Sequence, residues 1–144
     1  MMRLVVVALD AEEYGLPIDH VQEIIRHAEP RGIPSTAGAV RGVITLRSRI
    51  IPVCDLAAHL GVRGGDGPDR RIVIVESGGH RVGLIVDSVT EVMTVDEELV
   101  EPASASHDHR LSGIARDGDR LIVVVDAAAT VAGLGILHDG EEAA

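Results

Sequence analysis

The sequence GVITLRSRIIPVCDL, residues 42–56, predicts a β-hairpin that leads into a short helix. Two apolar runs, residues 43–46 and 50–53, flank the polar residues 47–49, and this pattern is typical of two strands joined by a tight turn. Asp55 follows at the position of a helix N-cap, ahead of an apolar segment that a glycine ends. The local prediction is therefore a hairpin followed by a single-turn helix.

The chain contains this unit twice. Residues 71–75 repeat the pattern of residues 3–7 at an offset of 68, and the hairpin recurs at an offset of 71. Glycines and aspartates recur at the same offsets, which chance matches between aliphatic strands do not explain. The aligned pairs are Gly15 and Gly83, Leu16 and Leu84, Asp19 and Asp87, Val21 and Val89, Glu23 and Glu91, Gly42 and Gly113, Arg49 and Arg120, Ile51 and Ile122, Val53 and Val124, and Asp55 and Asp126.

We predict a mainly β fold built from two similar halves, residues 1–65 and 66–135. Each half would hold four or five short strands with short helices and form a small β-barrel, and the two barrels would share a core and a groove. The glycine-rich segment 61–69 marks the boundary between the halves. Residues 136–144 are expected to be a short acidic tail. The whole chain, residues 1–144, is expected to be one domain.

The composition excludes several classes of partner. The 144 residues include one Tyr and no Phe or Trp, and the formal net charge is −10. Without aromatic stacking platforms, and with a charge that repels phosphate backbones, the chain is not expected to bind nucleic acid. Charged or small residues interrupt its apolar windows, so we expect a cytoplasmic protein without direct membrane insertion. Cys54 lies at the end of an apolar strand and is expected to be a buried small hydrophobe.

Residues 19–25 are expected to form a short helix. Asp19 would cap it, and Val21, Ile24 and Ile25 would share one face through their spacing of three and four residues. Val21 and Ile24 would then belong to the core or line an apolar groove. Such a groove accepts another helix or barrel rather than a planar cofactor.

Arg47 invites two interpretations. Its repeat counterpart is Gly118, so a turn at this position does not require arginine. Arg47 is either a solvated charge that blunts a strand edge, or an arginine held for recognition or for an ion pair with Glu23. Glu91 occupies the place of Glu23 in the second half without an equivalent of Arg47, which favours a plain surface role for both glutamates. Gly42 is expected to allow close approach of another backbone segment.

The sequence offers no catalytic constellation. It has no glycine-rich phosphate loop that opens a helix and no serine in a nucleophile elbow. His107 and His109 flank Asp108 and could contribute to a metal site, but no cluster of further ligands is visible nearby, and plain loop histidines are the alternative. No catalytic residue, cofactor or metal ion is therefore expected.

Four segments carry a family resemblance. They are EEYGLPIDHVQEII (12–25), GVITLRSRIIPVCDL (42–56), RVGLIVDSVTEVM (81–93) and GIARDGDRLIVVVD (113–126). By these motifs and their order, the chain is identified as a member of the CheW-like chemotaxis coupling proteins. The resemblance implies two SH3-like five-stranded β-barrel subdomains related by a pseudo-twofold axis, without catalysis. Thr45 and Ser48 stand where the family usually has Asn and Gly.

The resemblance also implies partners. Such adaptors couple methyl-accepting chemoreceptors to a chemotaxis histidine kinase, in receptor arrays beneath the inner face of the bacterial membrane. One surface would pair with the regulatory domain of the kinase, and the groove between the barrels would hold the cytoplasmic tip of the receptor. The resemblance places partner-binding positions at Val21, Glu23, Gly42 and Arg47, and Ile24 is a further candidate for the groove.

Two alternative functions stay open at this point. An adaptor of a non-flagellar pathway, such as one that controls pili or biofilm, would have the same fold and mode of binding but different partners. A small metal-binding enzyme would instead use His107 and His109.

Overall fold

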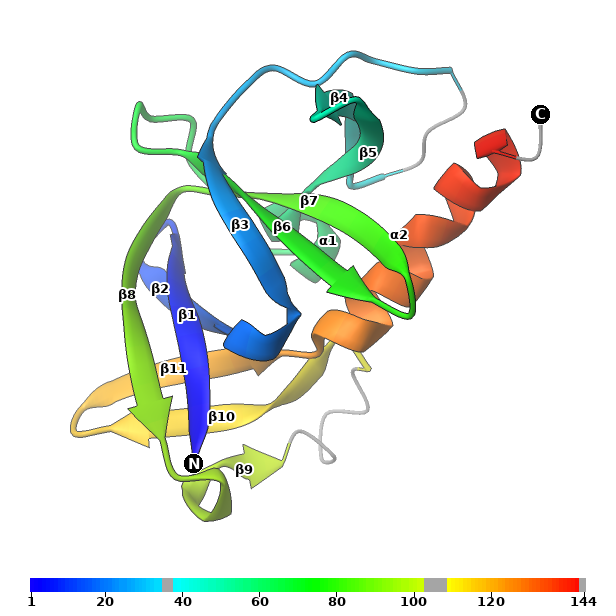
Figure 1. Cartoon of the computed structure of the whole chain (residues 1–144). Coiled ribbons are helices and arrows are strands. Elements are labelled where there is room, and N and C mark those ends of the chain that lie inside the picture. Colours follow the sequence, from blue (N-terminus) through cyan, green and yellow to red (C-terminus); the bar gives the residue numbers. More distant parts are fainter. Residues whose placement is uncertain (35–37, 103–108, 143–144) are drawn as a thin grey trace.

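The computed structural model describes residues 1–34, 38–102 and 109–142, with residues 135–142 described by their backbone alone. Figure 1 shows a mainly β fold with few helices. The strands are β1 (Met2–Leu9), β2 (Glu12–Pro17), β3 (Val21–Arg26), β4 (Val40–Leu46), β5 (Arg49–Asp55), β6 (Arg71–Ser77), β7 (His80–Val86), β8 (Ser88–Val95), β9 (Glu101–Pro102), β10 (Leu111–Asp117) and β11 (Arg120–Val125). The helices are η1 (Ile18–His20), α1 (Leu56–Leu60), η2 (Glu97–Leu99) and α2 (Ala127–Glu142).

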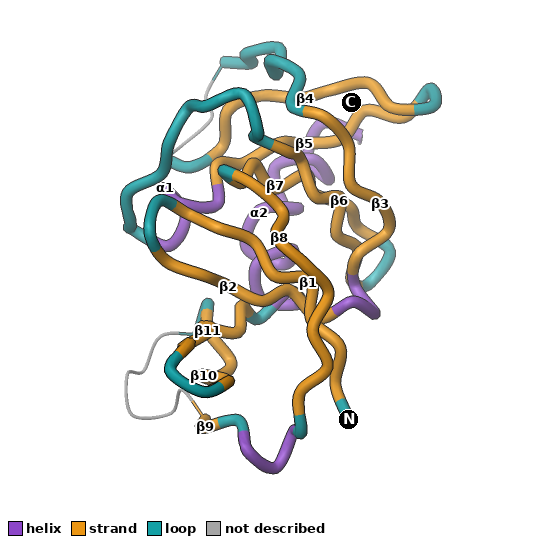
Figure 2. Tube along the Cα trace, turned by 90° about the vertical axis from the view of Figure 1, so that its left-hand side faces the viewer, coloured by secondary structure: helices purple, strands orange, loops and turns teal. Residues whose placement is uncertain are grey.

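The strands form two sheets, and each sheet takes strands from both halves of the sequence. One sheet has the order β8-β1-β2-β11-β10-β9, and the other has the order β3-β6-β7-β5-β4. The repeat relates β1, β2 and β3 to β6, β7 and β8, and the β4–β5 hairpin to the β10–β11 hairpin. These two hairpins lie at opposite ends of the molecule (Figures 1 and 2).

The mainly β class and the doubled architecture are confirmed. The expected subdomains, residues 1–65 and 66–135, do not each form a sheet of their own, however. The parallel pairs β2 with β11 and β5 with β7 join strands of one half to strands of the other. The glycine-rich segment 61–69 therefore divides the sequence repeat but not the two sheets.

Three apolar clusters fill the fold. One belongs to the six-stranded sheet, one to the five-stranded sheet, and the largest is shared by both sheets and both α-helices. Strand β1 shows the arrangement, because Leu4 and Val6 lie in the cluster of its own sheet while Val5 and Val7 lie in the shared cluster. Successive side chains point to opposite faces of a strand, so β1 is buried on both faces. This burial explains its continuous apolar run.

The central hairpin and its helix form as predicted. Strands β4 and β5 pair from Leu46 opposite Arg49 outward, and Asp55 caps α1 by accepting hydrogen bonds from the backbone amides of Ala57 and Ala58. Gly61 ends the helix in the left-handed conformation with φ of 72°, which glycine adopts without the penalty of a Cβ.

The helix predicted for residues 19–25 is wrong. Only η1, residues 18–20, is helical, and residues 21–26 form strand β3, which pairs with β6. Asp19 makes no side-chain cap in η1. Burial alternates along β3 with the period of a strand, so that Val21, Glu23 and Ile25 are half-buried while Ile24 is exposed. Apolar residues three and four positions apart, over so short a segment, are compatible with a strand as well as with a helix.

The C-terminal helix is longer than predicted. Helix α2 continues to Glu142, so residues 136–142 of the expected acidic tail are helical in their backbone. Val131 and Leu134 are buried in the shared core, and α2 packs on β5, β6 and β7 (Figure 1). This packing stabilises a helix that its glycines would weaken in isolation. No helix in the described ranges is long and apolar enough to cross a membrane.

Candidate functional site

Glu23 and Arg47 form an ion pair on the surface of the five-stranded sheet. Glu23 lies in β3, and Arg47 lies in the turn between β4 and β5. The Arg47 side chain is 75% exposed and that of Glu23 is 27% exposed. The ion pair that the sequence offered as one explanation of Arg47 is therefore present, and the arginine stays accessible to a partner.

The ion pair links the two edges of the five-stranded sheet. In the strand order, β3 is the first strand and β4 is the last. A contact between β3 and the turn that follows β4 therefore closes the curved sheet in the manner of a barrel. A hollow of about 220 Å³ lies beside the pair, and Leu46, Arg49 and Ile51 are among its lining residues.

Val21 and Ile24 lie on the same face of β3, because a register shift after Val21 pairs them with Val75 and Val73 of β6. Val21 is half-buried and packs against the shared core, as does Val89, its repeat counterpart in β8. It therefore lies at the junction of the two sheets, where the predicted groove would be lined. Ile24 is 41% exposed, so it is the more accessible of these two apolar residues.

Gly42 is fixed by backbone packing. Its φ is 144°, and a Cβ at this position would lie 2.1 Å from the carbonyl oxygen of Arg31. Arg31 and Val43 exchange two backbone hydrogen bonds of 2.8 and 2.9 Å directly beside it. The predicted close backbone approach is present. Gly113 has the same role in the second half, where a Cβ would lie 2.5 Å from the carbonyl oxygen of Glu101.

The turn that presents Arg47 is strained. Arg47 and Ser48 have φ of 49° and 67°, in the left-handed region that residues with a Cβ adopt at a cost. The corresponding turn of the second half has Gly118 with φ of 60°. The first half therefore keeps an arginine and a serine where the backbone conformation favours glycine, which argues that the Arg47 side chain has a use of its own.

The second half carries an ion-pair network that was not predicted. Arg120 donates two hydrogen bonds to the Glu13 carboxylate, at 3.0 and 2.9 Å, and one to Glu91 at 2.9 Å. The bonds from Arg120 hold the pKa of Glu13 below its ordinary value, and the bonds to Glu13 and then Glu91 raise the pKa of Arg120. Glu91 is thus a partner of an arginine rather than a plain surface residue.

The internal repeat contains one indirect indication of this network. The repeat aligns Arg120 with Arg49 and Glu91 with Glu23, so charged residues recur at matched positions in both halves. The contact between Glu13 and Arg120 spans 107 residues of the chain and depends on the parallel pairing of β2 with β11. That pairing is not visible in the sequence.

The described residues present no cluster of metal-ligating side chains. Within the ranges 1–34, 38–102 and 109–142, no group of three or more His, Cys, Asp and Glu side chains could hold a metal ion. His107 and Asp108, two residues of the candidate metal motif, lie outside the described residues. Cys54 is buried, and its burial raises the pKa of the thiol to about 12. Asp55 caps its helix as predicted, and its repeat counterpart Asp126 caps α2 by accepting a hydrogen bond from the backbone amide of Ala129.

Comparison with known proteins agrees with this architecture. Residues 3–134 match the family model described as CheW-like domain. The chain is 33% identical over 123 residues to a chemotaxis protein CheW of Klebsiella aerogenes, across 82% of this chain and 74% of the relative. It is 29% identical over 134 residues to chemotaxis protein CheW of Bacillus subtilis, across 90% of this chain and 86% of the relative.

A solved structure gives the same result. The crystal structure of scaffolding protein TtCheW from Thermoanaerobacter tengcongensis matches with a TM-score of 0.79 and 38% sequence identity, over 87% of this chain and 84% of that one. The resemblance that the four sequence segments carry is thereby confirmed. From its sequence, its doubled sheets and these matches, the chain belongs to the CheW-like domain family.

Proposed function

We propose that this chain is a non-enzymatic adaptor that couples methyl-accepting chemoreceptors to a chemotaxis histidine kinase in signalling arrays. The observation that carries the proposal is the family match over residues 3–134, which spans both sheets. The names of the similar proteins support it, since they are a chemotaxis protein and a scaffolding protein. The chain would act in the cytoplasm, in association with membrane-bound receptor arrays.

The proposed mechanism is bivalent binding. The regulatory domain of the kinase would pair with the outer surface of one sheet, and the cytoplasmic tip of a receptor would lie at the junction of the sheets near Val21. Because one chain would hold both partners, each would raise the effective concentration of the other. The ion pair of Glu23 with Arg47 would provide a polar contact for a partner, since the arginine is mostly exposed.

We assign receptor or kinase binding to Val21, Glu23, Ile24, Gly42 and Arg47. Gly42 would act indirectly, because its lack of a Cβ keeps the segment of Arg31 in place beside β4. Ile24 would contribute an exposed apolar contact on β3. The same site could serve an adaptor of a non-flagellar chemosensory pathway, with other receptors and another kinase.

A pull-down from the native cell lysate tests the proposal. The purified chain is compared with an Arg47→Ala variant. An Arg116→Ala variant serves as the control, because Arg116 is also exposed and its ion pair with Glu101 is long, at 4.0 Å. We expect the wild type and the control to recover a receptor and a chemotaxis-type kinase, and the Arg47→Ala variant to lose one of them. Recovery of neither partner by the wild type would contradict the proposed function. The identity of the recovered kinase separates the flagellar from the non-flagellar pathway.

A further inference from the structure

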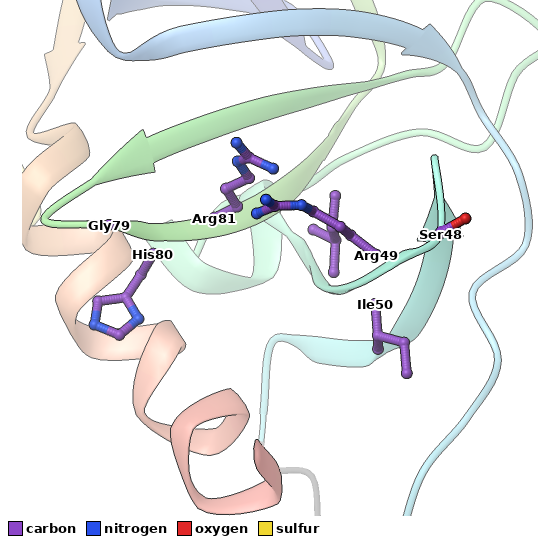
Figure 3. A pocket seen from close by; sticks show the side chains of 7 residues that line it. Ser48, Arg49, Ile50, Gly79, His80 and Arg81 are labelled. Carbon is purple, nitrogen blue, oxygen red and sulfur yellow. The ribbon is translucent and has the colours of Figure 1, made fainter.

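The repeat creates two equivalent grooves of opposite charge. The first, here called the β5–β7 groove, has a volume of about 460 Å³ and is lined by residues 48–51 and 79–81 (Figure 3). The second, the β2–β11 groove, has a volume of about 410 Å³ and includes residues 11–13, 120 and 121 in its lining. The repeat offsets match five lining residues of the two grooves, since residues 79–81 correspond to residues 11–13 and residues 49 and 50 correspond to residues 120 and 121. The two grooves therefore occupy equivalent places in the repeat and differ in their side chains.

The acidic groove is neutralised from within. In the β2–β11 groove, the Glu13 carboxylate receives two hydrogen bonds from Arg120, and Glu91 binds the same guanidinium. Asp117 adds a further carboxylate at 3.7 Å. This arginine is therefore fully engaged by side chains of its own chain.

The equivalent arginine of the other groove has no such partner. In the β5–β7 groove, Arg49 occupies the position of Arg120, and Arg81 occupies the position of Glu13. The ion pair of the β2–β11 groove is therefore replaced by two arginines. In the described part of the chain, Arg49 forms no ion pair. Arg81 donates one hydrogen bond from its Nε to Glu76 at 3.2 Å, and its two terminal nitrogens donate none to a described residue. Figure 3 shows the guanidinium end of Arg49 beside the Arg81 side chain.

An apolar wall lies beside these cations. Ile50 lines the β5–β7 groove and is 56% exposed, and Leu121 has the same place in the other groove with 54% exposed. A pair of close arginines favours a carboxylate that can receive hydrogen bonds from both. An exposed isoleucine next to them favours an aliphatic side chain on the same ligand.

We propose that the β5–β7 groove binds a short acidic segment of a partner protein, with a carboxylate between Arg49 and Arg81 and an aliphatic side chain against Ile50. The carboxylate of the partner would bind Arg49 as the Glu13 carboxylate binds Arg120 in the β2–β11 groove. The carboxylate–arginine contact is thus within the chain in one half of the molecule and between two proteins in the other half. The net charge of −10 opposes binding of a polyanion such as nucleic acid or an anionic lipid surface. The proposal does not depend on the chemotaxis function, because it rests on the side chains of the two grooves.

Selection from a library of short displayed peptides tests the proposal, with the full chain as the target. We expect the recovered peptides to be enriched in Asp or Glu next to an aliphatic residue. The strongest peptide should shift the backbone NMR signals of Arg49, Ile50 and Arg81 and should bind at least about tenfold more weakly to the Arg49→Gln and Arg81→Gln variants. Arg116→Gln removes the same charge outside the groove and should leave the affinity unchanged.

Three outcomes would overturn the proposal. The first is a set of recovered peptides without acidic enrichment. The second is equal affinity of the strongest peptide for the wild type and for both groove variants, each of which must first show a wild-type thermal unfolding curve. The third is a signal pattern reproduced by inorganic phosphate at the same concentration, which would assign the groove to a simple anion instead. A failure of the pull-down with receptor and kinase would leave these results unaffected, so the two proposals fail separately.

Discussion

Arg47, in the turn between β4 and β5, forms an ion pair with Glu23 of β3, which lies 24 residues earlier in the chain and at the opposite end of the strand order. The arginine is 75% exposed, and exposed ion pairs contribute only about 0–1 kcal/mol to stability. The turn that holds Arg47 is also strained, since Arg47 and Ser48 both have positive φ. A costly turn that presents a weakly stabilising charge is consistent with the binding role that we propose for Arg47.

Removing either partner of the ion pair should harm binding far more than stability. We expect Arg47→Ala and Glu23→Ala to weaken binding of a receptor or kinase fragment by about tenfold or more, because exposed arginines at interfaces commonly carry much of the binding energy. The free energy of unfolding should fall by no more than about 1 kcal/mol. Titration calorimetry and urea unfolding measure the two quantities.

A charge-swapped variant separates binding from ion-pair formation. Glu23→Arg combined with Arg47→Glu rebuilds an ion pair with the charges exchanged. The stability of this double variant should stay near that of the wild type. Its binding should be as weak as that of the single variants, because a partner meets the reversed charge. Recovery of wild-type affinity in this double variant would show that the pair acts only as a structural link.

Relief of the turn strain should stabilise the fold. Ser48 has φ of 67°, which glycine tolerates without a Cβ clash, so Ser48→Gly should raise the free energy of unfolding by about 0.5–1 kcal/mol after the extra entropy of the unfolded chain is subtracted. Ser48→Ala keeps the Cβ and should give no gain. Urea denaturation of the three proteins checks this, and a destabilised glycine variant would contradict the account of the turn.

The two equivalent glycines should be equally intolerant of a side chain. A Cβ at Gly42 or Gly113 would lie within 2.5 Å of a backbone carbonyl oxygen, so Gly42→Ala and Gly113→Ala should each cost about 2 kcal/mol or more. Gly67 has open space around the place of a Cβ, and Gly67→Ala is the matched control with little expected change. Thermal unfolding gives the comparison, and a wild-type melting temperature for Gly42→Ala would refute the packing role.

The ion pair of Glu13 with Arg120 should make stability depend on pH. The hydrogen bonds from Arg120 lower the folded-state pKa of Glu13 below its ordinary value of 4.5. A carboxyl group whose pKa is lowered by folding stabilises the fold above its unfolded pKa, and this contribution is lost as the pH falls through the folded pKa. Stability should therefore decline below about pH 4.5, and Glu13→Gln should reduce the slope of that decline.

Unfolding by urea at a series of pH values checks this dependence. Glu12→Gln is a suitable control, because Glu12 neighbours Glu13 but makes no ion pair with a described residue. Identical slopes for Glu13→Gln and the wild type would show that the pair does not contribute.

Local signals in the sequence were sufficient for much of the fold. The hairpin of β4 and β5, the cap at Asp55 and the stop at Gly61 depend on residues within a few positions of one another, and these patterns have a direct structural meaning. The doubled architecture followed from the repeat offsets. The exchange of strands did not, because matching offsets show which segments are equivalent and not which segments pair.

The errors also have physical causes. Strand β3 was predicted as a helix because Val21, Ile24 and Ile25 fit a helical spacing, whereas pairing with β6 decides its conformation. Helix α2 was predicted too short because its length depends on burial of Val131 and Leu134 in the shared core. The ion pair of Glu23 with Arg47 is one of the two interpretations that the unusual arginine in a turn allows. The bond of Glu13 with Arg120 was not, since β2 meets β11 only in the folded chain.

Co-sedimentation of kinase with receptor tests the central claim most directly. A kinase fragment with its regulatory domain is mixed with assembled receptor cytoplasmic fragments, with and without the full chain. The adaptor account predicts that the kinase sediments with the receptor only when the chain is present, and that the Arg47→Ala variant reduces this recruitment while Arg116→Ala does not. Kinase recruitment that is the same with and without the chain would contradict the account.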